Sequence, residues 1–520
     1  MVETLGDILP FAAQKYADKT GLVCGGRSFS FNELEALSNA FANSLAAAGV
    51  SAGDRVTLYG PNSWQWMVGY YGIAKNGAVV IPVNALLTAE EVVFIIKDSG
   101  ARILVGSTDK VAPFLDMRAS KGLSQIVAWG ESVPAAAASF NRWLEQGSCF
   151  FTLRRRSQKD SGAICYTSGT TGHPKGAVQS QRSIVAAAKG MVLMSTRTTI
   201  DTVVSPLPCP HVYGSITVNT AMLTGSTLVL LPRFSEEGVL GAIQEHRATI
   251  FDCVPTAYYY LLAHPNFDAY DLSSLTRCTV GGQTLPAAKS REWTERTGAP
   301  VLEFWGMTEL AGAATGNPYW GDNKPGTIGL PMPGMYCKVV AVDDAEKEMA
   351  TGERGELMIR GPLVMDGYVG NEQATREIIR RDGWMHTGDI ATVDEDGYYT
   401  IVDRKKDMIL TAGYNVYPAE LERVLCIHTS VALAAVCGVA DEAKGELAKA
   451  YIMLKPGASA SGKELVEHCR QRLAAYKLPR AVQFVANVPI TGSGKIMHRL
   501  LKDVDDGTRF VSERRETRPT

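Results

Sequence analysis

The sequence lacks the patterns that mark a disulfide scaffold, a zinc site or a P-loop. Its ten cysteines are scattered through 520 residues, and none forms a Cys-x-x-Cys pair. Disulfide scaffolds are short and dense in cysteine, so we expect reduced thiols and a cytoplasmic protein. There is no Gly-x-x-x-x-Gly-Lys-Ser/Thr loop of the Walker A type and no cluster of His and Cys at zinc-ligand spacing.

The chain also has little excess charge and no long apolar run. Its formal net charge is -2, from 52 basic and 54 acidic residues, so no global field favours nucleic acid or an anionic membrane. No apolar segment reaches the length that spans a bilayer. Met1 to Pro10 shows no basic and apolar leader pattern, and Thr517 to Thr520 is not a peroxisomal address. We therefore expect no nucleic-acid partner and no transmembrane segment.

The first three hundred or so residues alternate between helix and strand signals. Ser30 with Glu33, and Thr88 with Glu91, form two possible capping boxes ahead of helical apolar patterns. The β-branched run 78–83 is typical of a buried strand. Such alternation predicts a mainly parallel sheet covered by helices, in a chain long enough for two or more domains.

The pattern changes after about Gly326. Short strand signals separated by Gly and Asp turns predict a β-rich subdomain. The charged run 403–407 follows, and we interpret it as a linker, because five ionised side chains in succession do not suit a buried strand. A small α+β unit is expected beyond it. Its predicted elements are strands near 431–436 and 448–454, a helix over 461–475 and a strand at 482–485.

The strongest chemical signal is the segment Tyr166-Thr-Ser-Gly-Thr-Thr-Gly-His-Pro-Lys-Gly176. Glycines and small hydroxyl residues let backbone N–H groups and hydroxyls approach phosphate oxygens, and Lys175 adds positive charge. The segment follows a predicted strand over 163–165, so we expect it at a strand's carboxyl end. A flexible surface turn is the alternative.

This segment resembles the signature loop of the adenylate-forming superfamily, which includes acyl-CoA synthetases, adenylation domains of peptide synthetases and luciferases. Further segments resemble the motifs of that family, in the expected order and as far as about residue 500. They are Trp305-Gly-Met-Thr-Glu309, His386-Thr-Gly-Asp389, Asp403-Arg-Lys-Lys-Asp407, Gly413-Tyr-Asn-Val-Tyr-Pro418 and Pro489-Ile-Thr-Gly-Ser-Gly-Lys-Ile496. The resemblance, closest to bacterial acyl-CoA synthetases, implies an AMP-binding N-terminal domain over 1–402, a hinge over 403–407 and a mobile α+β domain over 408–520.

The resemblance assigns a nucleotide site to these motifs. Asp389 would accept the ribose hydroxyls, with Arg404 near the ribose or phosphate, and Trp305 would stack on adenine. Thr308 would bond the α-phosphate, and Glu309 with Thr167 would bind Mg²⁺, which prefers hard oxygen ligands. Lys495 would reach the acyl carboxylate and the α-phosphate during adenylation. The remaining residues expected to contact ATP are Ser168, Gly169, Thr170, Thr171, Gly172, Lys175, Gly281, Gly282, Gln283, Gly306 and Met307.

The acid and thiol sites follow from the same resemblance. His211 would border the acyl pocket and the channel for the thiol, although a structural histidine is a serious alternative. Pro210 stands where the family usually has an aromatic residue, which changes the pocket's shape. The implied residues are His211, Val212, Tyr213, Gly281, Gly306 and Gly312 for the acyl pocket, Gly413, Tyr414 and Lys477 for the coenzyme A channel, and Lys406 for the hinge.

The sequence favours an acid–thiol ligase that forms an acyl-adenylate and then acyl-CoA, using ATP, Mg²⁺ and coenzyme A. The alternative is a free-standing adenylation enzyme that loads a carrier protein. A luciferase-like oxygenase has nothing in its favour, and a non-catalytic relative would have lost Glu309, Asp389 or Lys495. The neutral pocket residues predict an uncharged acid, medium-chain or aryl. Oligomeric state stays open, and a homodimer is compatible with the sequence.

Overall fold

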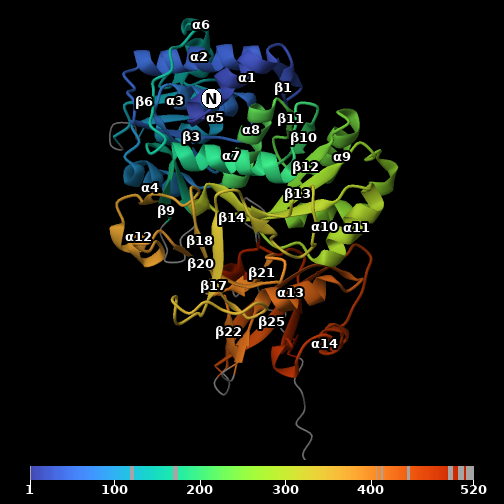
Figure 1. The fold of residues 1–520 in the computed structure, drawn as a ribbon. Coiled ribbons are helices and arrows are strands. Elements are labelled where there is room, and N and C mark those ends of the chain that lie inside the picture. Colours follow the sequence, from blue (N-terminus) through green and yellow to red (C-terminus); the bar gives the residue numbers. More distant parts are fainter. Residues whose placement is uncertain are drawn as a thin grey trace, which may run out of the picture.

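The computed structural model describes residues 2–116, 122–167, 174–405, 407–411, 414–441, 445–489, 496–501 and 509–510. A large N-terminal α/β part fills the upper two thirds of Figure 1, and a small α+β part lies below it. The described residues form four sheets, two of them large and mainly parallel. This is the fold class that the sequence predicted.

The first large sheet is parallel from β7 to β8, and β9 and β19 are antiparallel at its edge, where β9 pairs with β8. The predicted phosphate loop joins those two strands, at the carboxyl end of β8. The strands, in order across the sheet, are β19 (Gly367–Tyr368), β9 (Lys175–Ser180), β8 (Ser161–Thr167), β4 (Val79–Val83), β3 (Arg55–Tyr59), β5 (Ile103–Ser107), β6 (Gln125–Trp129) and β7 (Ala138–Ser139).

The second large sheet is parallel from β1 through β14, and β2, β15 and β16 are antiparallel at its edges. The carboxyl ends of β13 and β14 therefore open on the same edge. The strands in order are β16 (Leu330–Pro331), β15 (Gly312–Gly316), β14 (Val301–Met307), β13 (Arg277–Gly281), β12 (Ile250–Cys253), β10 (Thr202–Ser205), β11 (Thr227–Leu230), β1 (Thr20–Cys24) and β2 (Arg27–Ser30).

Helices join and cover these sheets. Helix α7 contacts β8 and β9 of one large sheet and β15 of the other, and it packs on α8 (Figure 1). The N-terminal helices are α1 (Ile8–Tyr16), α2 (Phe31–Ala47), α3 (Trp64–Lys75), α4 (Ala89–Ser99), α5 (Thr108–Val111), α6 (Phe140–Gln146), α7 (Gln181–Ser195), α8 (Val212–Thr224), α9 (Glu236–Glu245), α10 (Pro255–Ala263), α11 (Ala287–Thr297) and α12 (Glu372–Ile378).

Local sequence explains where several helices begin. Both predicted capping boxes are present. The Ser30 and Thr88 hydroxyls accept from the backbone N–H groups of Glu33 and Glu91, and the carboxylates of these glutamates accept from the backbone N–H groups of Ser30 and Thr88. Pro255 occupies the first turn of α10, where its missing N–H costs nothing. These caps satisfy donors that would otherwise be unpaired at helix starts.

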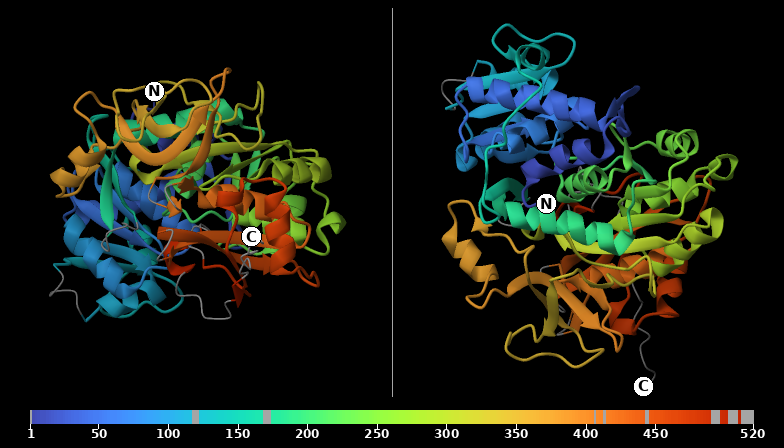
Figure 2. Two further views of the ribbon diagram at one scale, coloured as in Figure 1. Left: turned by 90° about the horizontal axis from the view of Figure 1, so that it is seen from below. Right: turned by 45° about the horizontal axis from the view of Figure 1, so that its top comes forward.

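The predicted β-rich subdomain is a four-stranded antiparallel sheet. Its strands are β17 (Tyr336–Val340), β18 (Gly355–Arg360), β20 (Met385–Val393) and β21 (Tyr399–Arg404). The chain leaves this sheet at β21 and enters the small C-terminal part, which is coloured dark orange to red in Figure 2.

The C-terminal part has its own sheet, in which the long hairpin of β24 and β25 is central. Its strands are β23 (Tyr414–Val416), β22 (Ile409–Thr411), β25 (Gly445–Leu454), β24 (Val431–Asp441), β26 (Ala481–Phe484) and β27 (Arg509–Phe510). Its helices are α13 (Pro418–Cys426), α14 (Gly462–Arg470) and α15 (His498–Leu501), with the short 3₁₀ turn η6 (Ala475–Lys477).

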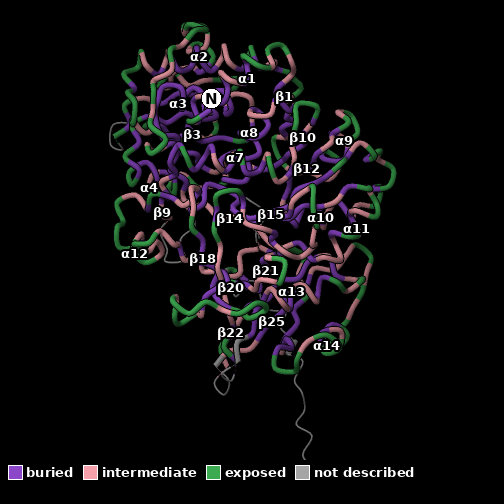
Figure 3. Tube along the Cα trace, in the orientation of Figure 1, coloured by how far each residue is buried: buried purple, intermediate pink, exposed green. Residues whose placement is uncertain are grey.

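Each part has a separate buried core, seen as purple segments in Figure 3. The N-terminal core gathers residues from both large sheets and the helices between them, including the fully buried Trp66 and Trp293. The C-terminal core is built on Leu421, Val436 and Leu465. Tyr259 of α10 packs against both cores, so the two parts touch through this side chain.

Two details of the sequence prediction are wrong. The helix expected over 461–475 ends at Arg470, and η6 covers its last residue. Asp403 and Arg404 belong to β21, and Asp403 is 5% exposed, although the charged run was expected to lie outside any buried strand. Burial is tolerated because the Asp403 carboxylate accepts from the backbone N–H groups of Arg404 (2.6 Å) and Ala419 (2.9 Å). Burial still raises the pKa of Asp403 to about 7.

Candidate active site

The predicted phosphate segment begins and ends on paired strands. Thr167 at the end of β8 lies opposite Lys175 at the start of β9, and its hydroxyl donates to the Lys175 carbonyl at 3.5 Å. The Lys175 ammonium is 5.2 Å from the centre of the Tyr368 ring, a cation–π contact. Ser168, Gly169, Thr170, Thr171 and Gly172 lie outside the described residues.

Glu309 is buried in a short 3₁₀ turn, η5 (Thr308–Leu310), directly after β14. Two hydrogen bonds to backbone carbonyls fix this turn. Gln179 Nε2 donates to the Thr308 carbonyl at 2.9 Å, and the Met365 N–H donates to the Glu309 carbonyl at 2.9 Å. The Tyr368 hydroxyl donates to Glu309 Oε1 at 2.8 Å. Tyr368 therefore contacts both the predicted metal ligand and the predicted phosphate lysine.

Sequence reasoning missed Tyr368. It lies in β19, which pairs with β9, and it is 59 residues from Glu309 along the chain. Burial raises the pKa of the Tyr368 hydroxyl, and the charge of Glu309 and the hydrogen bond to it raise this pKa further. The Tyr368 hydroxyl therefore stays protonated and can donate. The Gly367-Tyr368 pair falls between the recognised motifs, so no local signal indicated this contact.

Asp389 and Trp305 come from different sheets and meet at one point. The Trp305 indole N–H donates to Asp389 Oδ2 at 2.8 Å, across a separation of 84 residues. Arg404 Nε lies 3.1 Å from Asp389 Oδ1, which has no hydrogen-bond donor among the described residues. The Asp389 carboxylate, which is the predicted ribose ligand, is thus buried and oriented by Trp305. Its Oδ1 can still accept hydrogen bonds.

A buried glutamate supports the turn that carries Asp389. Glu356 is 4% exposed, and its carboxylate accepts from the Gly388 N–H at 3.3 Å and lies 3.2 Å from the Lys405 ammonium. The Thr387 hydroxyl donates to the Leu357 carbonyl and accepts from the Asp389 N–H. These contacts fix the Thr-Gly-Asp segment against β18.

The predicted acyl-pocket residues gather where α8 meets the ends of β13, β14 and β15. His211 is the N-cap of α8, and its Nδ1 accepts from the Tyr213 N–H at 3.2 Å; its place beside the acyl pocket stays a prediction. Val212 and Tyr213 begin the helix. A Cβ on Gly306 would lie 1.7 Å from the Gly312 carbonyl oxygen, so the close approach of these strands requires glycine at residue 306.

Gly281, Gly282 and Gln283 leave the end of β13 beside this region, and Met307 ends β14. The residues predicted for the thiol channel belong to the C-terminal part. Lys477 is buried in the small part, where its ammonium contacts both carboxylate oxygens of Glu420 at 2.7 and 2.8 Å. Tyr414 begins β23, opposite Thr411. Lys406, Gly413 and Lys495 lie outside the described residues.

The donor set constrains what metal the site could hold. Across the described ranges no group of three or more His, Cys, Asp or Glu side chains is placed to bind a metal ion by itself. Glu309 offers one buried carboxylate and Thr167 one hydroxyl, which suits Mg²⁺ held partly by substrate phosphates.

Among the residues that the structure describes, no helix is both long enough and apolar enough to cross a bilayer.

Comparison with known proteins agrees with this geometry. The family model described as AMP-binding enzyme matches residues 9–369, and that of the AMP-binding enzyme C-terminal domain matches residues 420–495. A long-chain-fatty-acid–CoA ligase of Bacillus subtilis is 32% identical, with 98% of this chain and 96% of the relative covered.

Two solved structures are similar over nearly the whole chain. The anthranilate CoA ligase AuaEII in complex with anthranoyl-AMP has a TM-score of 0.90 at 31% identity, covering 96% of each chain. ATP-bound MatB from Rhodopseudomonas palustris has a TM-score of 0.88 at 30% identity, covering 97% of this chain and 99% of that one.

The fold and the converging motifs thus define an adenylate-forming enzyme. The chain belongs to the AMP-binding enzyme family and is an AMP-forming acid–thiol ligase of the acyl-CoA synthetase type. The family indicated by the sequence motifs is confirmed.

Proposed function

We propose that this enzyme activates a neutral monocarboxylic acid with ATP and Mg²⁺, releasing pyrophosphate, and transfers the acyl group to coenzyme A with release of AMP. The observation that carries the proposal is the 2.8 Å contact between Trp305 and Asp389, which unites two motifs 84 residues apart. Asp389 Oδ1, which is ion-paired with Arg404 but accepts no hydrogen bond among the described residues, suits a ribose hydroxyl as its donor.

In the first step the acid carboxylate attacks the α-phosphorus, and the bond to pyrophosphate breaks. Both reactants are anions, so the step needs oriented donors and cations. Thr308 would donate to the α-phosphate, Lys175 and the glycine-rich loop would hold the leaving phosphates, and Lys495 would neutralise charge between carboxylate and phosphate. When bound, Mg²⁺ supplies charge neutralisation of the phosphates, and Glu309 with Thr167 would hold it.

In the second step the thiol of coenzyme A attacks the acyl carbonyl and AMP leaves. Gly413, Tyr414 and Lys477 would line the thiol's approach after the small domain turns about Lys406. The Lys477 ammonium is ion-paired with Glu420. To line the channel, Lys477 must either leave Glu420 or bring the whole ion pair to the channel wall. The free thiols of all ten cysteines suit a reducing cytoplasm.

The neutrality of the acid rests on the residues around α8. Val212, Tyr213, Gly281, Gly306 and Gly312 are uncharged, and Arg233 lies exposed in the loop after β11. A dicarboxylate would bury its second charge there without a partner, which is costly. Among the relatives, one is named for long-chain fatty acids and one for the aromatic anthranilate.

The test supplies ATP, Mg²⁺, one acid and either coenzyme A or a phosphopantetheinyl carrier protein. Pyrophosphate and thioester are measured for benzoate, hexanoate, malonate and succinate. We expect acyl-CoA from the neutral acids, with kcat/KM at least about tenfold above that of either dicarboxylate. A preference for malonate or succinate would refute the acid assignment, and acylation of the carrier protein alone would refute coenzyme A as acceptor.

A further inference from the structure

Gln179 connects the two large sheets behind the candidate catalytic turn. It lies on β9 of the first sheet, and its side chain is 3% exposed. Its Nε2 donates at 2.9 Å to the carbonyl of Thr308, in the turn η5 that follows β14 of the second sheet. This turn carries Thr308 and Glu309, the residues expected to bind the α-phosphate and Mg²⁺. A buried hydrogen bond therefore reaches the turn from a different sheet.

The turn η5 ends in a backbone conformation that its sequence does not favour. Ala311, the residue after the turn, has a φ of 53°, in the left-handed region that residues other than glycine rarely adopt. The Ala311 N–H closes the turn by donating to the Thr308 carbonyl at 3.2 Å. Gln179 donates to the same carbonyl oxygen, so it supports the atom on which the turn closes. Strained segments of this kind persist where contacts from outside hold them.

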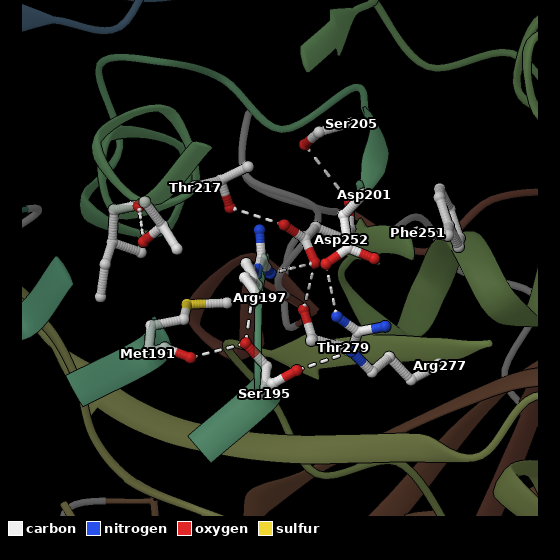
Figure 4. A network of polar contacts seen from close by, with 12 residues as sticks. Met191, Ser195, Arg197, Asp201, Ser205, Thr217, Phe251, Asp252, Arg277 and Thr279 are labelled. Carbon is white, nitrogen blue, oxygen red and sulfur yellow. Dashed lines mark hydrogen bonds and ion pairs between the residues drawn. The ribbon is translucent and has the colours of Figure 1, made fainter. Parts of the chain in front are cut away.

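Helix α7 fixes the two sheets relative to one another. It begins directly after β9, and its last residue, Ser195, lies beside buried ion pairs of the second sheet. The Arg197 guanidinium lies 2.7 Å from the Asp252 carboxylate on β12. Arg277 on β13 lies 2.7 Å from Asp201 and donates to the Ser195 carbonyl at 2.6 Å. Figure 4 shows these residues together at the end of α7. The donor on β9 and the acceptor after β14 thus belong to one connected framework.

Strand β9 also begins at the predicted phosphate lysine. Lys175 is its first residue, and Ala177 pairs with Tyr368 of β19, whose hydroxyl donates to Glu309. The strand therefore supports Glu309 through its neighbour β19, and Thr308 through Gln179. A shift of η5 relative to β9 would move the expected α-phosphate donor away from the phosphates that Lys175 is expected to hold.

We infer that Gln179 is a positioning residue for adenylation, because its hydrogen bond keeps η5 in the conformation that places Thr308 against the α-phosphate. The inference rests on the proposed function, since it takes Thr308 as the donor to that phosphate. Gln179 contacts the backbone of the turn, so its loss should slow the chemical step more than it weakens the binding of ATP. Misplacing a reacting group by about 1 Å can cost about a hundredfold in rate.

The experiment measures pyrophosphate release without thiol, with the acid that gives the highest rate. Gln179→Met keeps the length of the side chain and removes its donor. Its kcat should fall roughly tenfold to a hundredfold, while the KM for ATP changes by less than about threefold.

Gln181→Met is the matched control. Gln181 is 1% exposed, and its Oε1 accepts from the Leu5 N–H at 2.9 Å in the N-terminal segment. This variant should lose comparable thermal stability and keep the kcat of the wild type. Equal kcat in Gln179→Met and Gln181→Met would overturn the inference.

Gln179→Glu gives a readout that a general loss of packing would not change. Burial raises the pKa of a carboxyl at this position, and only its protonated form can donate to the Thr308 carbonyl. At about pH 6 the kcat of Gln179→Glu should therefore exceed that of Gln179→Met by at least about threefold, and the difference should shrink as the carboxyl ionises at higher pH. Equal rates of the two variants at pH 6 would contradict the positioning role.

Thr308→Val separates this inference from the proposed function. Loss of the α-phosphate donor should slow pyrophosphate release by roughly 10²–10³. Because Gln179 acts through Thr308, the double variant should be less impaired than the product of the two single losses. Wild-type kcat in Thr308→Val would count against the role proposed for Thr308. Fully additive losses, with Thr308→Val slow, would count against the inference alone.

Discussion

At the scale of single residues, Tyr368 connects two charges of opposite sign. Its hydroxyl holds the Glu309 carboxylate at 2.8 Å, and its ring lies 5.2 Å from the Lys175 ammonium. A carboxylate that is to accept a metal ion gains from an oriented partner, which fixes one oxygen and leaves the other free. Tyr368 is therefore expected to position Glu309 for Mg²⁺ bound to ATP.

Tyr368→Phe keeps the ring over Lys175 and removes the hydroxyl. A hydrogen bond to a charged group contributes about 1.5–3 kcal/mol, so adenylation should slow by roughly tenfold to a hundredfold, with a higher Mg²⁺ concentration needed for half-maximal rate. Pyrophosphate release without coenzyme A, measured across Mg²⁺ concentrations, checks this. Tyr399→Phe, which removes a hydroxyl bonded to the Cys337 carbonyl, is the control. An unchanged Mg²⁺ dependence in Tyr368→Phe would exclude the positioning role.

The candidate site could be predicted only where its residues stand together in sequence. Thr308 and Glu309 follow Trp305 within one motif, and Asp389 ends another, so their types and order are visible in the chain. The partner of the Tyr213 hydroxyl is not visible in this way, because Thr279 lies 66 residues further along the chain, on β13. Such contacts depend on strand order and register, which no local pattern specifies.

At the scale of elements, α15 is held on the C-terminal part by a charged contact. His498 Nε2 lies 2.8 Å from Glu422 Oε1 on α13, and Leu501 packs among residues of β24 and β25. Burial lowers the pKa of His498, but attraction to Glu422, with further help from Asp407 and Asp403, outweighs it and raises the pKa to about 9.

This shift gives the folded state a pH dependence with a defined sign. The folded pKa of His498 is raised from 6.5 to about 9, so the contact stabilises fully below about pH 6.5 and is lost as the pH rises through 9. His498→Gln should lower the stability of the small domain by about 1–3 kcal/mol near pH 6 and by much less near pH 10. Thermal unfolding of both proteins at the two pH values measures this. An equal difference at both would show that protonated His498 contributes nothing.

Elements were predicted best where local chemistry determines them. Capping boxes at Ser30 and Thr88 marked the starts of α2 and α4 because the cap is complete within four residues. Asp403 was misjudged because its burial depends on the Ala419 N–H, which the next domain supplies. The predicted helix after Ser461 is longer than the observed one, because nothing in the apolar pattern marks its end at Arg470.

At the scale of the whole molecule, the described contacts between the two parts lie around α10, β21 and α13. Tyr259 of α10 packs on the C-terminal cores, Ile390 and Val402 pack against Tyr417, and Asp403 accepts from Ala419. The resemblance to adenylate-forming enzymes implies that the small domain changes its orientation between the two steps. The small domain is expected to present Lys495 in the first step and the thiol channel in the second.

Two substitutions should separate those steps. Lys495→Ala should slow acyl-adenylate formation by roughly 10²–10³, the cost of removing one preorganised donor or cation, and should spare thioester formation from synthetic acyl-adenylate. Lys406→Pro restricts φ at the hinge, so adenylation should survive while thioester formation collapses. Pyrophosphate release without thiol and thioester formation from the adenylate measure the two steps. Equal slowing of both steps in both variants would contradict domain alternation.

The order of chemical steps can be followed by the carboxylate oxygens of the acid. When the carboxylate attacks the α-phosphorus and the thiol later attacks the carbonyl, one carboxylate oxygen leaves with AMP. Turnover of ¹⁸O-labelled benzoate with ATP and coenzyme A should therefore give AMP that carries one ¹⁸O atom, and unlabelled pyrophosphate, by mass spectrometry. Label in pyrophosphate or inorganic phosphate, or AMP without label, would contradict an acyl-adenylate on the path to acyl-CoA.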